Sequence, residues 1–347
     1  YLKPYNLLFG PETSTANRCC IGGMVGNNSC GLHSLVYGSA RDHLLEAKVI
    51  LADGKQVLLK QYSKEKFSAK AQQNDLEGKI YKYIESTYSN EDLKKEIIEN
   101  FPEKEVSRRN NGYALDSLIE NTNPNLAKLF AGSEGTLGFA TEFKLNLVSL
   151  PPKHKAVICV HFSELKDSFT GNLIALRHSP MAVELMDNNI IEAAYRNPTQ
   201  KQNTFFIEDE PKAILIIEFA EESEEKLQAK LQETISDFKE NSSAYAFPII
   251  YNEKISRVWE LRKAGLGLLT NVAGDYKPVS VIEDTAVAPK RLPSYLSEFE
   301  DVLSSYNLKC VYHAHIATGE LHLRPILNLK KKEDVERFYN LSKDVAL

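Results

Sequence analysis

The sequence predicts an α+β protein in two parts, with the boundary near Pro151 and Pro152. Before this boundary, a glycine- and asparagine-rich stretch leads into strands in which apolar and polar residues alternate. After it, short β segments alternate with amphipathic helices, which indicates a sheet domain covered by helices on one face. The length of 347 residues and the hydrophobic content of 43% allow two domains, each with its own core.

The composition favours a small-molecule enzyme. The formal net charge of −5 leaves no basic surface for nucleic acid. The sequence has no secretory signal and no apolar span of about 20 residues, the length a transmembrane helix needs. The five cysteines are odd in number and include no C-x-x-C pair. We therefore expect reduced thiols and a cytoplasmic location.

A glycine-rich stretch lies within residues 17–54. Four glycines and two asparagines crowd together there: Gly22, Gly23, Gly26, Asn27, Asn28 and Gly31. Because glycine accepts positive φ and has no Cβ, such a run can turn backbone N–H groups inward as a nest for a phosphate. Neither the Rossmann nor the P-loop fingerprint is present. On spacing alone, a surface loop before an edge strand is an equal alternative.

The remaining elements of the first part follow in order. Residues 44–55 indicate a half-buried strand that enters a tight turn at Asp53-Gly54. Residues 62–88 and 90–100 have helical periodicity, and we interpret about 62–105 as a helical insertion. Residues 108–113 form a polar loop, either close to a ligand or simply solvated. A second glycine-rich segment, 132–141, precedes a strand at 142–150.

The second part begins after Pro152. Its expected strands are 156–162, 182–185, 213–219, 244–251, 280–287 and 308–315, the last with a continuation to 326. Its expected helices are 163–177, 223–240, 254–270, 293–306 and 331–345.

Three histidines, His313, His315 and His322, stand within ten residues. On a strand, His313 and His315 share a face, and Gly319 permits a turn that brings His322 back toward them. Clustered imidazoles favour a metal or substrate site, although three hydrogen-bonded sheet histidines are the alternative. Arg324 follows two positions after His322 and shares its strand face.

Two acids, Glu283 and Asp284, lie in a strand that we expect to be buried. Buried carboxylates need hydrogen bonds or cations, which Lys277 or Arg262 could supply. We interpret the pair as structural support rather than as chemistry.

Both glycine-rich segments resemble the FAD-binding domain of the vanillyl-alcohol oxidase and p-cresol methylhydroxylase (PCMH) superfamily of FAD-linked oxidases. In that family the first segment is approximately GGM…N…G…YG…D…V…DG and the second is GSEGTLG, and both stand nearly complete in this sequence. Residues 151–347 resemble the cap domain of the branch that oxidises D-2-hydroxyglutarate, D-lactate and glycolate. The phrases at 183–187, VELMD, and 258–262, VWELR, carry that resemblance.

The resemblance implies a fold and a domain division. Residues 1–150 would be the C-terminal part of a PCMH-type FAD-binding domain, incomplete at its N-terminus. Residues 151–347 would be an α+β cap domain with an antiparallel sheet, incomplete at its C-terminus. The implied FAD contacts are Gly22, Gly23, Asn27, Asn28, Gly31, Tyr37, Gly38, Gly132, Ser133, Glu134, Gly135, Thr136 and Gly138.

The resemblance also implies a site in the cap. The family motif H-x-G-x-G-x-x-H, whose histidines bind a divalent metal such as zinc, matches His315 and His322, with Ala317 in place of the first glycine. Arg262 matches the arginine that clamps the substrate carboxylate, and Arg324 would make a second contact. We therefore expect Arg262, Arg324 and His322 in catalysis. His313 has no counterpart in the motif and is the less favoured ligand.

The implied activity is FAD-dependent oxidation of a D-2-hydroxy acid to the 2-oxo acid, with hydride transfer to the flavin. Alternatives are a flavin oxidase of a non-carboxylate alcohol or ether lipid, and a non-catalytic nucleotide-binding fragment. An iron–sulfur cluster would belong to a part outside these residues, as would the general base and the third metal ligand. The electron acceptor is left open, as are a homodimer and peripheral attachment to the inner membrane. We expect these 347 residues alone to be colourless, metal-poor and inactive.

Overall fold

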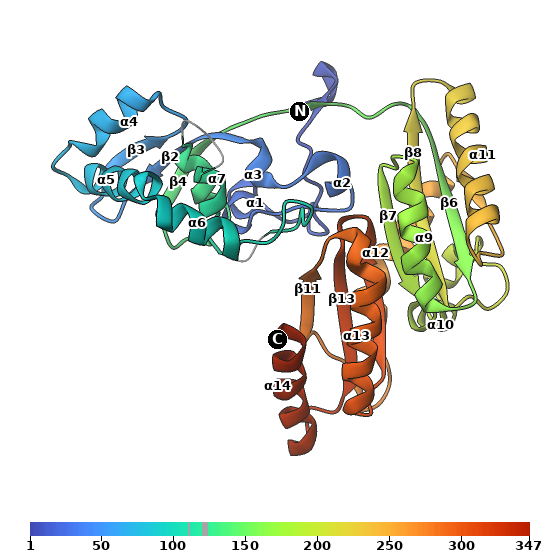
Figure 1. Cartoon of the computed structure of the whole chain (residues 1–347). Coiled ribbons are helices and arrows are strands. Elements are labelled where there is room, and N and C mark those ends of the chain that lie inside the picture. Colours follow the sequence, from blue (N-terminus) through green and yellow to red (C-terminus); the bar gives the residue numbers. More distant parts are fainter. Residues whose placement is uncertain (110–111, 120–123) are drawn as a thin grey trace. The chain divides into compact units, whose positions relative to one another are not determined.

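The computed structural model describes residues 1–109, 112–119 and 124–347, and the chain divides into two compact units (Figure 1). Unit 1 comprises residues 1–104 and 109–150, and unit 2 comprises residues 105–108 and 151–347. Asn110 and Asn111 of the expected polar loop lie outside the described residues.

Unit 1 contains a three-stranded antiparallel sheet in the order β3-β2-β4. Its strands are β2 (Leu44–Ile50), β3 (Gln56–Leu59) and β4 (Phe139–Leu145). The hairpin expected at Asp53-Gly54 is confirmed: Gly54 has a φ of 82°, and the Lys55 amide donates to Asp53 Oδ1 over 3.0 Å. The strand expected at 142–150 lies earlier in the structure, where β4 starts at Phe139 and ends at Leu145. A short pair, β1 (Leu7–Leu8) with β5 (Val148–Ser149), is separate from this sheet.

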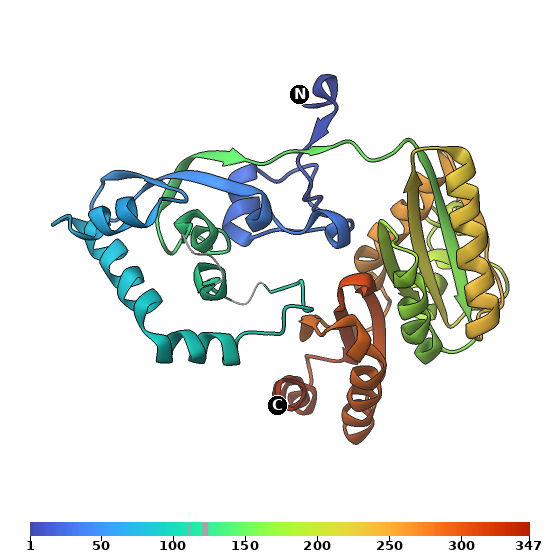
Figure 2. The ribbon, with the colours of Figure 1, turned by 45° about the horizontal axis from the view of Figure 1, so that its top comes forward.

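Eight helices of the described residues belong to unit 1. They are α1 (Ile21–Asn27), α2 (Ser34–Tyr37), α3 (Ala40–His43), α4 (Lys64–Ala71), α5 (Leu76–Ser89), α6 (Glu91–Asn100), α7 (Leu115–Ile119) and α8 (Leu126–Phe130). Phe67, Tyr81 and Ile84 of α4 and α5 pack in one hydrophobic core with Val49 and Val57 of the sheet. These helices therefore cover the sheet. Figure 2 shows α5 and α6 as consecutive cyan helices that meet at an angle.

The helix expected over residues 62–88 is two helices in the structure. Ser63 caps α4, and the Asp75 side chain caps α5 by accepting from the Gly78 amide over 2.9 Å. An N-cap residue has extended backbone and starts a new helix. The first helix therefore ends at Ala71, and a new one starts after Asp75.

Unit 2 is built on an eight-stranded sheet in the order β10-β13-β12-β7-β8-β6-β9, with β11 also paired to β13. Every pairing is antiparallel, as expected. The strands are β6 (His154–Phe162), β7 (Ala182–Asp187), β8 (Ala213–Glu221), β9 (Ile249–Tyr251), β10 (Lys277–Pro278), β11 (Ile282–Ala286), β12 (Cys310–His315) and β13 (Glu320–Leu327). β9 is shorter than the expected 244–251.

The helices of unit 2 are α9 (Leu165–Arg177), α10 (Asn188–Arg196), α11 (Glu224–Asn241), α12 (Lys254–Thr270), α13 (Leu292–Ser305) and α14 (Lys332–Ala346). The sequence predicted all of them except α10. α10 follows β7 directly, because Asp187 is the last residue of that strand and also the N-cap of the helix, with its side chain accepting from the Ile190 amide.

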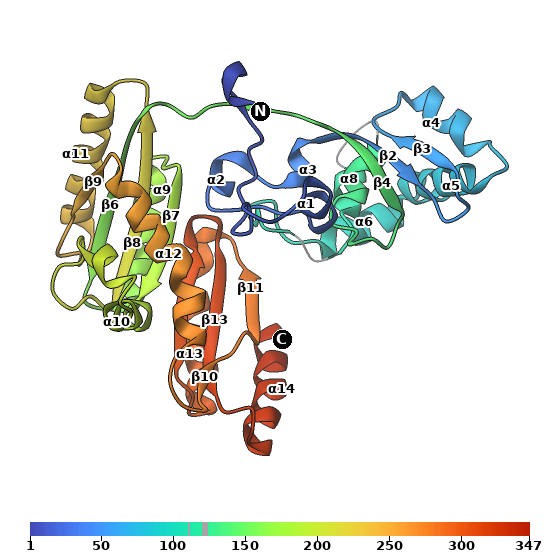
Figure 3. The same cartoon turned by 180° about the vertical axis from the view of Figure 1, so that it is seen from behind.

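Helices cover both faces of the central strands, which corrects the expectation of one covered face. Phe162 of β6 packs against Phe238 of α11 on one face, and Glu218 of β8 accepts from the indole of Trp259 of α12 on the other. Figure 1 shows α9 in front of the sheet, and Figure 3, seen from behind, shows α12 in front of the opposite face. A strand covered on both sides has no solvent face, and β7 is accordingly buried along its whole length.

Among the described residues, no helix combines the length and the apolar character needed to cross a bilayer.

Candidate functional site

The three histidines meet at the hairpin that β12 and β13 form. His313 lies opposite His322 in the register, and His315 lies opposite Glu320. A turn through Gly319, with a φ of 77°, joins the strands, and a Cβ there would lie 1.8 Å from the Val287 carbonyl oxygen. The ring centroids are 4.6 Å apart for His313 and His322, and 5.3 Å apart for His315 and His322.

His315 is held by a buried carboxylate of the neighbouring strand. Its Nδ1 lies 2.8 Å from Glu184 Oε1 of β7. The other oxygen of Glu184 lies 2.7 Å from Arg262 Nη2 of α12. Arg262 also donates from Nη2 to the Ala314 carbonyl oxygen over 3.2 Å. The structure therefore brings His315 and Arg262 together through one residue, Glu184.

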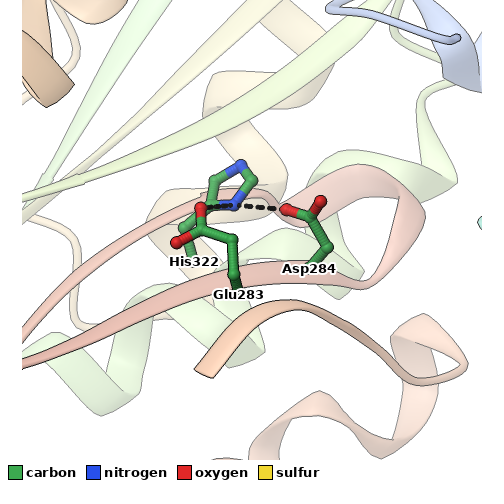
Figure 4. Close-up of side chains that lie close together, drawn as sticks. All are labelled: Glu283, Asp284 and His322. Atoms are coloured by element: carbon green, nitrogen blue, oxygen red, sulfur yellow. Dashed lines mark ion pairs between the residues drawn. The ribbon is translucent and has the colours of Figure 1, made fainter. Parts of the chain in front are cut away.

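His322 faces two acids of β11 (Figure 4). Its Nδ1 lies 3.0 Å from Glu283 Oε1 and 2.9 Å from Asp284 Oδ1. The two acids follow Ile282 where the register of β11 on β13 shifts, and Asp284 has a φ of 56°. Both are exposed, so the expectation of a buried pair is wrong. A register shift turns side chains out of the regular alternation, which the sequence pattern did not reveal.

The partners of these acids also differ from the expectation. Glu283 Oε1 accepts from Arg324 Nη2 over 2.8 Å, and Arg324 donates from Nη1 to Ser280. The Lys277 ammonium donates instead to the Val272 carbonyl oxygen, and Arg262 pairs with Glu184. Burial disfavours the charged His322 ring, but the carboxylates of Asp284 and Glu283 outweigh burial and raise the pKa of His322 to about 9.

The donor set around His322 suits a divalent metal. The ligand atoms of Glu283, Asp284 and His322 all lie within 4.8 Å of one another. His322 Nδ1 is buried and has no hydrogen bond within the described residues, although both carboxylates are close to it. Imidazole nitrogen with carboxylate oxygen is a common donor combination for zinc and manganese. The described residues therefore fit a metal, with His322 as a ligand.

A further arginine reaches this cluster from residues 105–108 of unit 2. Arg108 Nη1 lies 2.7 Å from Glu320 Oε2, and both side chains are buried. The charge of Arg108 lowers the pKa of Glu184 and of Asp284 as a lesser contribution. From the sequence, Arg108 was expected only to belong to the polar loop at 108–113, because nothing in the linear pattern links it to Glu320.

In unit 1, the two glycine-rich segments lie side by side. The Gly132 amide donates to the Val25 carbonyl oxygen over 3.0 Å, and the Glu134 amide donates to that of Gly26 over 2.9 Å. Asn27 Nδ2 donates to Glu134 Oε1 over 3.2 Å. The first segment differs from the expected open nest, because residues 21–27 form the helix α1 and bury Met24 and Val25. Asn28, in the left-handed region, ends that helix.

The expected cofactor residues differ in what surrounds them. A Cβ would lie 1.3 Å from the Glu12 oxygen at Gly31, 2.4 Å from Asp42 at Gly38, 2.7 Å from Arg41 at Gly132 and 2.6 Å from Val49 at Gly138. At Gly31 and Gly138 a neighbouring backbone segment leaves no room for a Cβ, and at Gly38 and Gly132 the positive φ values of 65° and 85° also favour glycine. At Gly22, Gly23 and Gly135, a Cβ would meet none of the described residues within 4 Å. These three glycines are exposed, so a ligand could approach the backbone there.

Polar groups stand beside these open glycines. The buried Ser133 hydroxyl has no hydrogen-bond partner within the described residues. Thr136 Oγ1 donates to the Ser133 carbonyl oxygen and lies 2.7 Å from the hydroxyl of Tyr113. Tyr37 contributes its carbonyl oxygen to the His43 ring, 2.6 Å from Nε2. Of these groups, the unpartnered Ser133 hydroxyl is a donor and acceptor that a bound ligand would satisfy.

Comparison with known proteins defines the class. The family model described as FAD linked oxidases, C-terminal domain, matches residues 151–347, more than half of the chain, and the model of an FAD binding domain matches residues 1–60. The chain therefore belongs to the FAD-linked oxidases, and FAD is the cofactor of that family.

Curated relatives narrow the comparison. The chain is 30% identical over 365 residues to the D-2-hydroxyglutarate dehydrogenase of Escherichia coli, covering 100% of this chain and 35% of the relative. The D-2-hydroxyglutarate dehydrogenase of Pseudomonas putida is 29% identical, over 95% of this chain and 33% of the relative. The glycolate oxidase subunit GlcD of Bacillus subtilis is 23% identical, over 95% of this chain and 57% of the relative. The chain spans about a third of the length of the two dehydrogenases.

Solved structures agree on the fold. p-Cresol methylhydroxylase with substrate bound has a TM-score of 0.57 at 12% identity, over 99% of this chain and 62% of that one. 4-Ethylphenol oxidase from Gulosibacter chungangensis has the same TM-score at 11% identity and the same coverage.

Proposed function

We propose that the protein is an FAD-dependent dehydrogenase that oxidises a D-2-hydroxy acid to the 2-oxo acid. Membership of the FAD-linked oxidases and the names of the relatives support this proposal. The observation that carries it is the cluster of unit 2, where two arginines and two histidines meet around three carboxylates. The basic side chains are Arg262, Arg324, His315 and His322, and the carboxylates are those of Glu184, Glu283 and Asp284. A hydroxy acid offers a carboxylate for the arginines and a hydroxyl for the metal or the imidazoles.

In this proposal, Arg262 and Arg324 bind the substrate carboxylate. The Nε of each arginine is buried and has no hydrogen bond among the described residues, although the Nη2 of each is ion-paired. A guanidinium offers five N–H donors in a planar fork and binds carboxylates through two of them. In each arginine the Nη2 on that edge is already ion-paired, so each Nε would add one donor, and the two arginines together would supply two donors for the substrate carboxylate. An alcohol or ether lipid without a carboxylate would not satisfy them.

We further propose a divalent metal, zinc or a similar ion, at the same cluster. His322, Glu283 and Asp284 would hold it, and His315 is the second histidine that the family motif assigns. A metal there orients the hydroxyl and the carboxylate of the substrate. We assign no iron–sulfur cluster to these residues.

For the cofactor, we propose that residues 1–150 form the FAD-binding domain and residues 151–347 the cap. The open glycines Gly22, Gly23 and Gly135 would lie against FAD, together with Asn27, Ser133 and Thr136. Bound flavin supplies the hydride acceptor. The role of the protein is to orient the substrate and to exclude water. A cytoplasmic location is part of the proposal, supported by free cysteines.

The test is an absorbance titration of the purified full-length protein. We expect a flavin spectrum that is bleached anaerobically by a D-2-hydroxy acid and not by its L enantiomer. His322→Ala should lose metal and most turnover and keep its flavin. Bleaching by an alcohol without a carboxylate would favour the lipid or alcohol oxidase. A full-length protein without flavin would refute the proposal.

A further inference from the structure

Glu184 is the most deeply buried carboxylate of the cluster. It is 1% exposed, and it stands near the middle of β7, a strand buried along its whole length. One oxygen lies 2.8 Å from His315 Nδ1, and the other lies 2.7 Å from Arg262 Nη2. Its two partners come from β12 and α12, far apart in the sequence.

The fold explains why both partners reach the same carboxylate. β7 pairs antiparallel with β12, with Ala314 opposite Leu185, so His315, which follows Ala314, runs alongside Glu184, which precedes Leu185. Side chains alternate along a strand. Glu184 lies opposite Ile216 of β8 and therefore points to the same face as Glu218, the face that α12 covers. An uncompensated charge there would be costly. The two contacts compensate it.

The contact with His315 determines which ring nitrogen is free. A carboxylate is an acceptor only, so the hydrogen bond places the proton of a neutral ring on Nδ1. The lone pair is then on Nε2, which is free to bind a metal or accept a substrate proton. Carboxylate partners of this kind orient metal-binding histidines and raise their basicity. Arg262 is fixed by the other oxygen and by the Ala314 carbonyl group.

We propose that Glu184 is a positioning residue that sets the tautomer of His315 and the direction of Arg262 at the same time. The inference rests on the proposed function, because it assigns a consequence to those two side chains. One carboxylate links the imidazole to the arginine. A change at Glu184 therefore disturbs metal affinity and substrate affinity together, although Glu184 touches neither ligand.

The rival explanation is a buried ion pair that only stabilises the sheet, and the chain offers a matched control. Glu218 of β8 is 2% exposed and lies on the same face. Its Oε2 accepts from Trp259 Nε1 over 2.8 Å, one helical turn before Arg262 on α12, and its Oε1 lies 3.5 Å from Lys155 Nζ. Glu218 resembles Glu184 in burial, strand face and helix partner, and it contacts an indole and an ammonium group where Glu184 contacts an imidazole and a guanidinium.

The experiment compares Glu184→Gln with Glu218→Gln in the full-length protein. The readouts are the zinc dissociation constant from chelator competition, the KM and kcat for the D-2-hydroxy acid, and the midpoint of thermal unfolding. The midpoint should fall to a similar extent in both variants. Glu184→Gln alone should weaken zinc binding by about 10- to 100-fold and raise KM at least as strongly. Glu218→Gln should leave both constants unchanged.

Equal zinc affinity and equal KM in Glu184→Gln and the wild type would overturn the inference and leave the proposed function intact. Failure of the wild type to bind zinc or to turn over would refute both. If Glu184→Gln does not fold, Glu184→Asp replaces it, because the charge stays and the shorter side chain cannot hold both partners at their distances. The same direction of change is then expected, and wild-type constants would again overturn the inference.

Discussion

His313 and His322 face each other across the β12 and β13 pair, with ring centroids 4.6 Å apart. His313 is buried, and its Nδ1 has no hydrogen bond within the described residues. Burial, followed by the charge of Arg262, lowers the pKa of His313 well below its usual value. His313 therefore stands as an uncharged neighbour beside the acid-lined His322.

We expect His313→Leu to keep the metal site. Leucine has a similar volume and removes a buried nitrogen without a partner, so the free energy of unfolding should stay the same or rise by about 1 kcal/mol. Urea unfolding can be followed by the fluorescence of Trp259, the single tryptophan, which lies in unit 2. The zinc dissociation constant should stay within about twofold of the wild type. A zinc affinity at least tenfold weaker in the variant would show that His313 is a metal ligand.

The buried N-cap Asp187 should make the stability of unit 2 depend on pH. Burial outweighs the hydrogen bonds from Asn189, Tyr312 and Ile190 and raises the pKa of Asp187 from 3.8 to about 6. The folded state then holds the proton more tightly than the unfolded state. The contribution of Asp187 to the free energy of unfolding is therefore greatest below pH 3.8, and it is lost as the pH rises through about 6. The loss is about 3 kcal/mol.

The variant Asp187→Asn isolates this effect, because an amide does not titrate. The difference in unfolding free energy, wild type minus variant, should fall by up to about 3 kcal/mol between about pH 4 and about pH 7. Urea unfolding by Trp259 fluorescence measures it at each pH. A difference that stays constant with pH would show that Asp187 has an ordinary pKa.

The sequence predicted regular elements better than it predicted side-chain partners. The amphipathic pattern of unit 2 predicted five of its six described helices, because such patterns and start signals, for example Ser223 before α11 and Pro293 in α13, are local in the sequence. The sequence analysis did not predict α10, because the residue that caps this helix, Asp187, is also the last residue of a strand. The histidine motif marked His315 and His322. Glu184, 131 positions before His315, looks like any polar residue in a strand, and only the strand order brings the two together.

Arg41 should hold the loops of the expected flavin site in unit 1. Its guanidinium donates to three backbone carbonyl groups: Nη2 to Ala131 over 2.8 Å, Nε to Lys128 over 3.2 Å and Nη1 to Arg109 over 3.3 Å. Its own amide donates to Asn28 Oδ1 over 2.7 Å. One residue therefore connects the end of α1 to the segment before Gly132.

We expect Arg41→Lys to destabilise unit 1, because one ammonium group cannot reach all three carbonyl groups. The loss of charge-assisted hydrogen bonds should lower the free energy of unfolding by about 2–4 kcal/mol and weaken flavin retention. Circular dichroism during urea unfolding measures the first effect, and gel filtration of the yellow protein the second. Arg196→Lys, at an exposed pair with Glu192, is the control and should change neither. A stable, fully yellow Arg41→Lys would contradict this role.

The open glycines of α1 allow stability and cofactor binding to be separated. A Cβ at Gly22 would meet none of the described residues within 4 Å, and the same holds for Gly267 within α12 of the other unit. Alanine is a better helix former than glycine by up to about 1 kcal/mol. Both Gly22→Ala and Gly267→Ala should therefore fold at least as well as the wild type.

If FAD lies against α1, only Gly22→Ala should raise the FAD dissociation constant, by about tenfold or more, equivalent to about 1.4 kcal/mol. Titration of the flavin-free full-length protein with FAD, followed by flavin fluorescence, measures this constant. Wild-type affinity in Gly22→Ala would show that the space beside α1 is not occupied by FAD, and the assignment of this segment would have to be withdrawn.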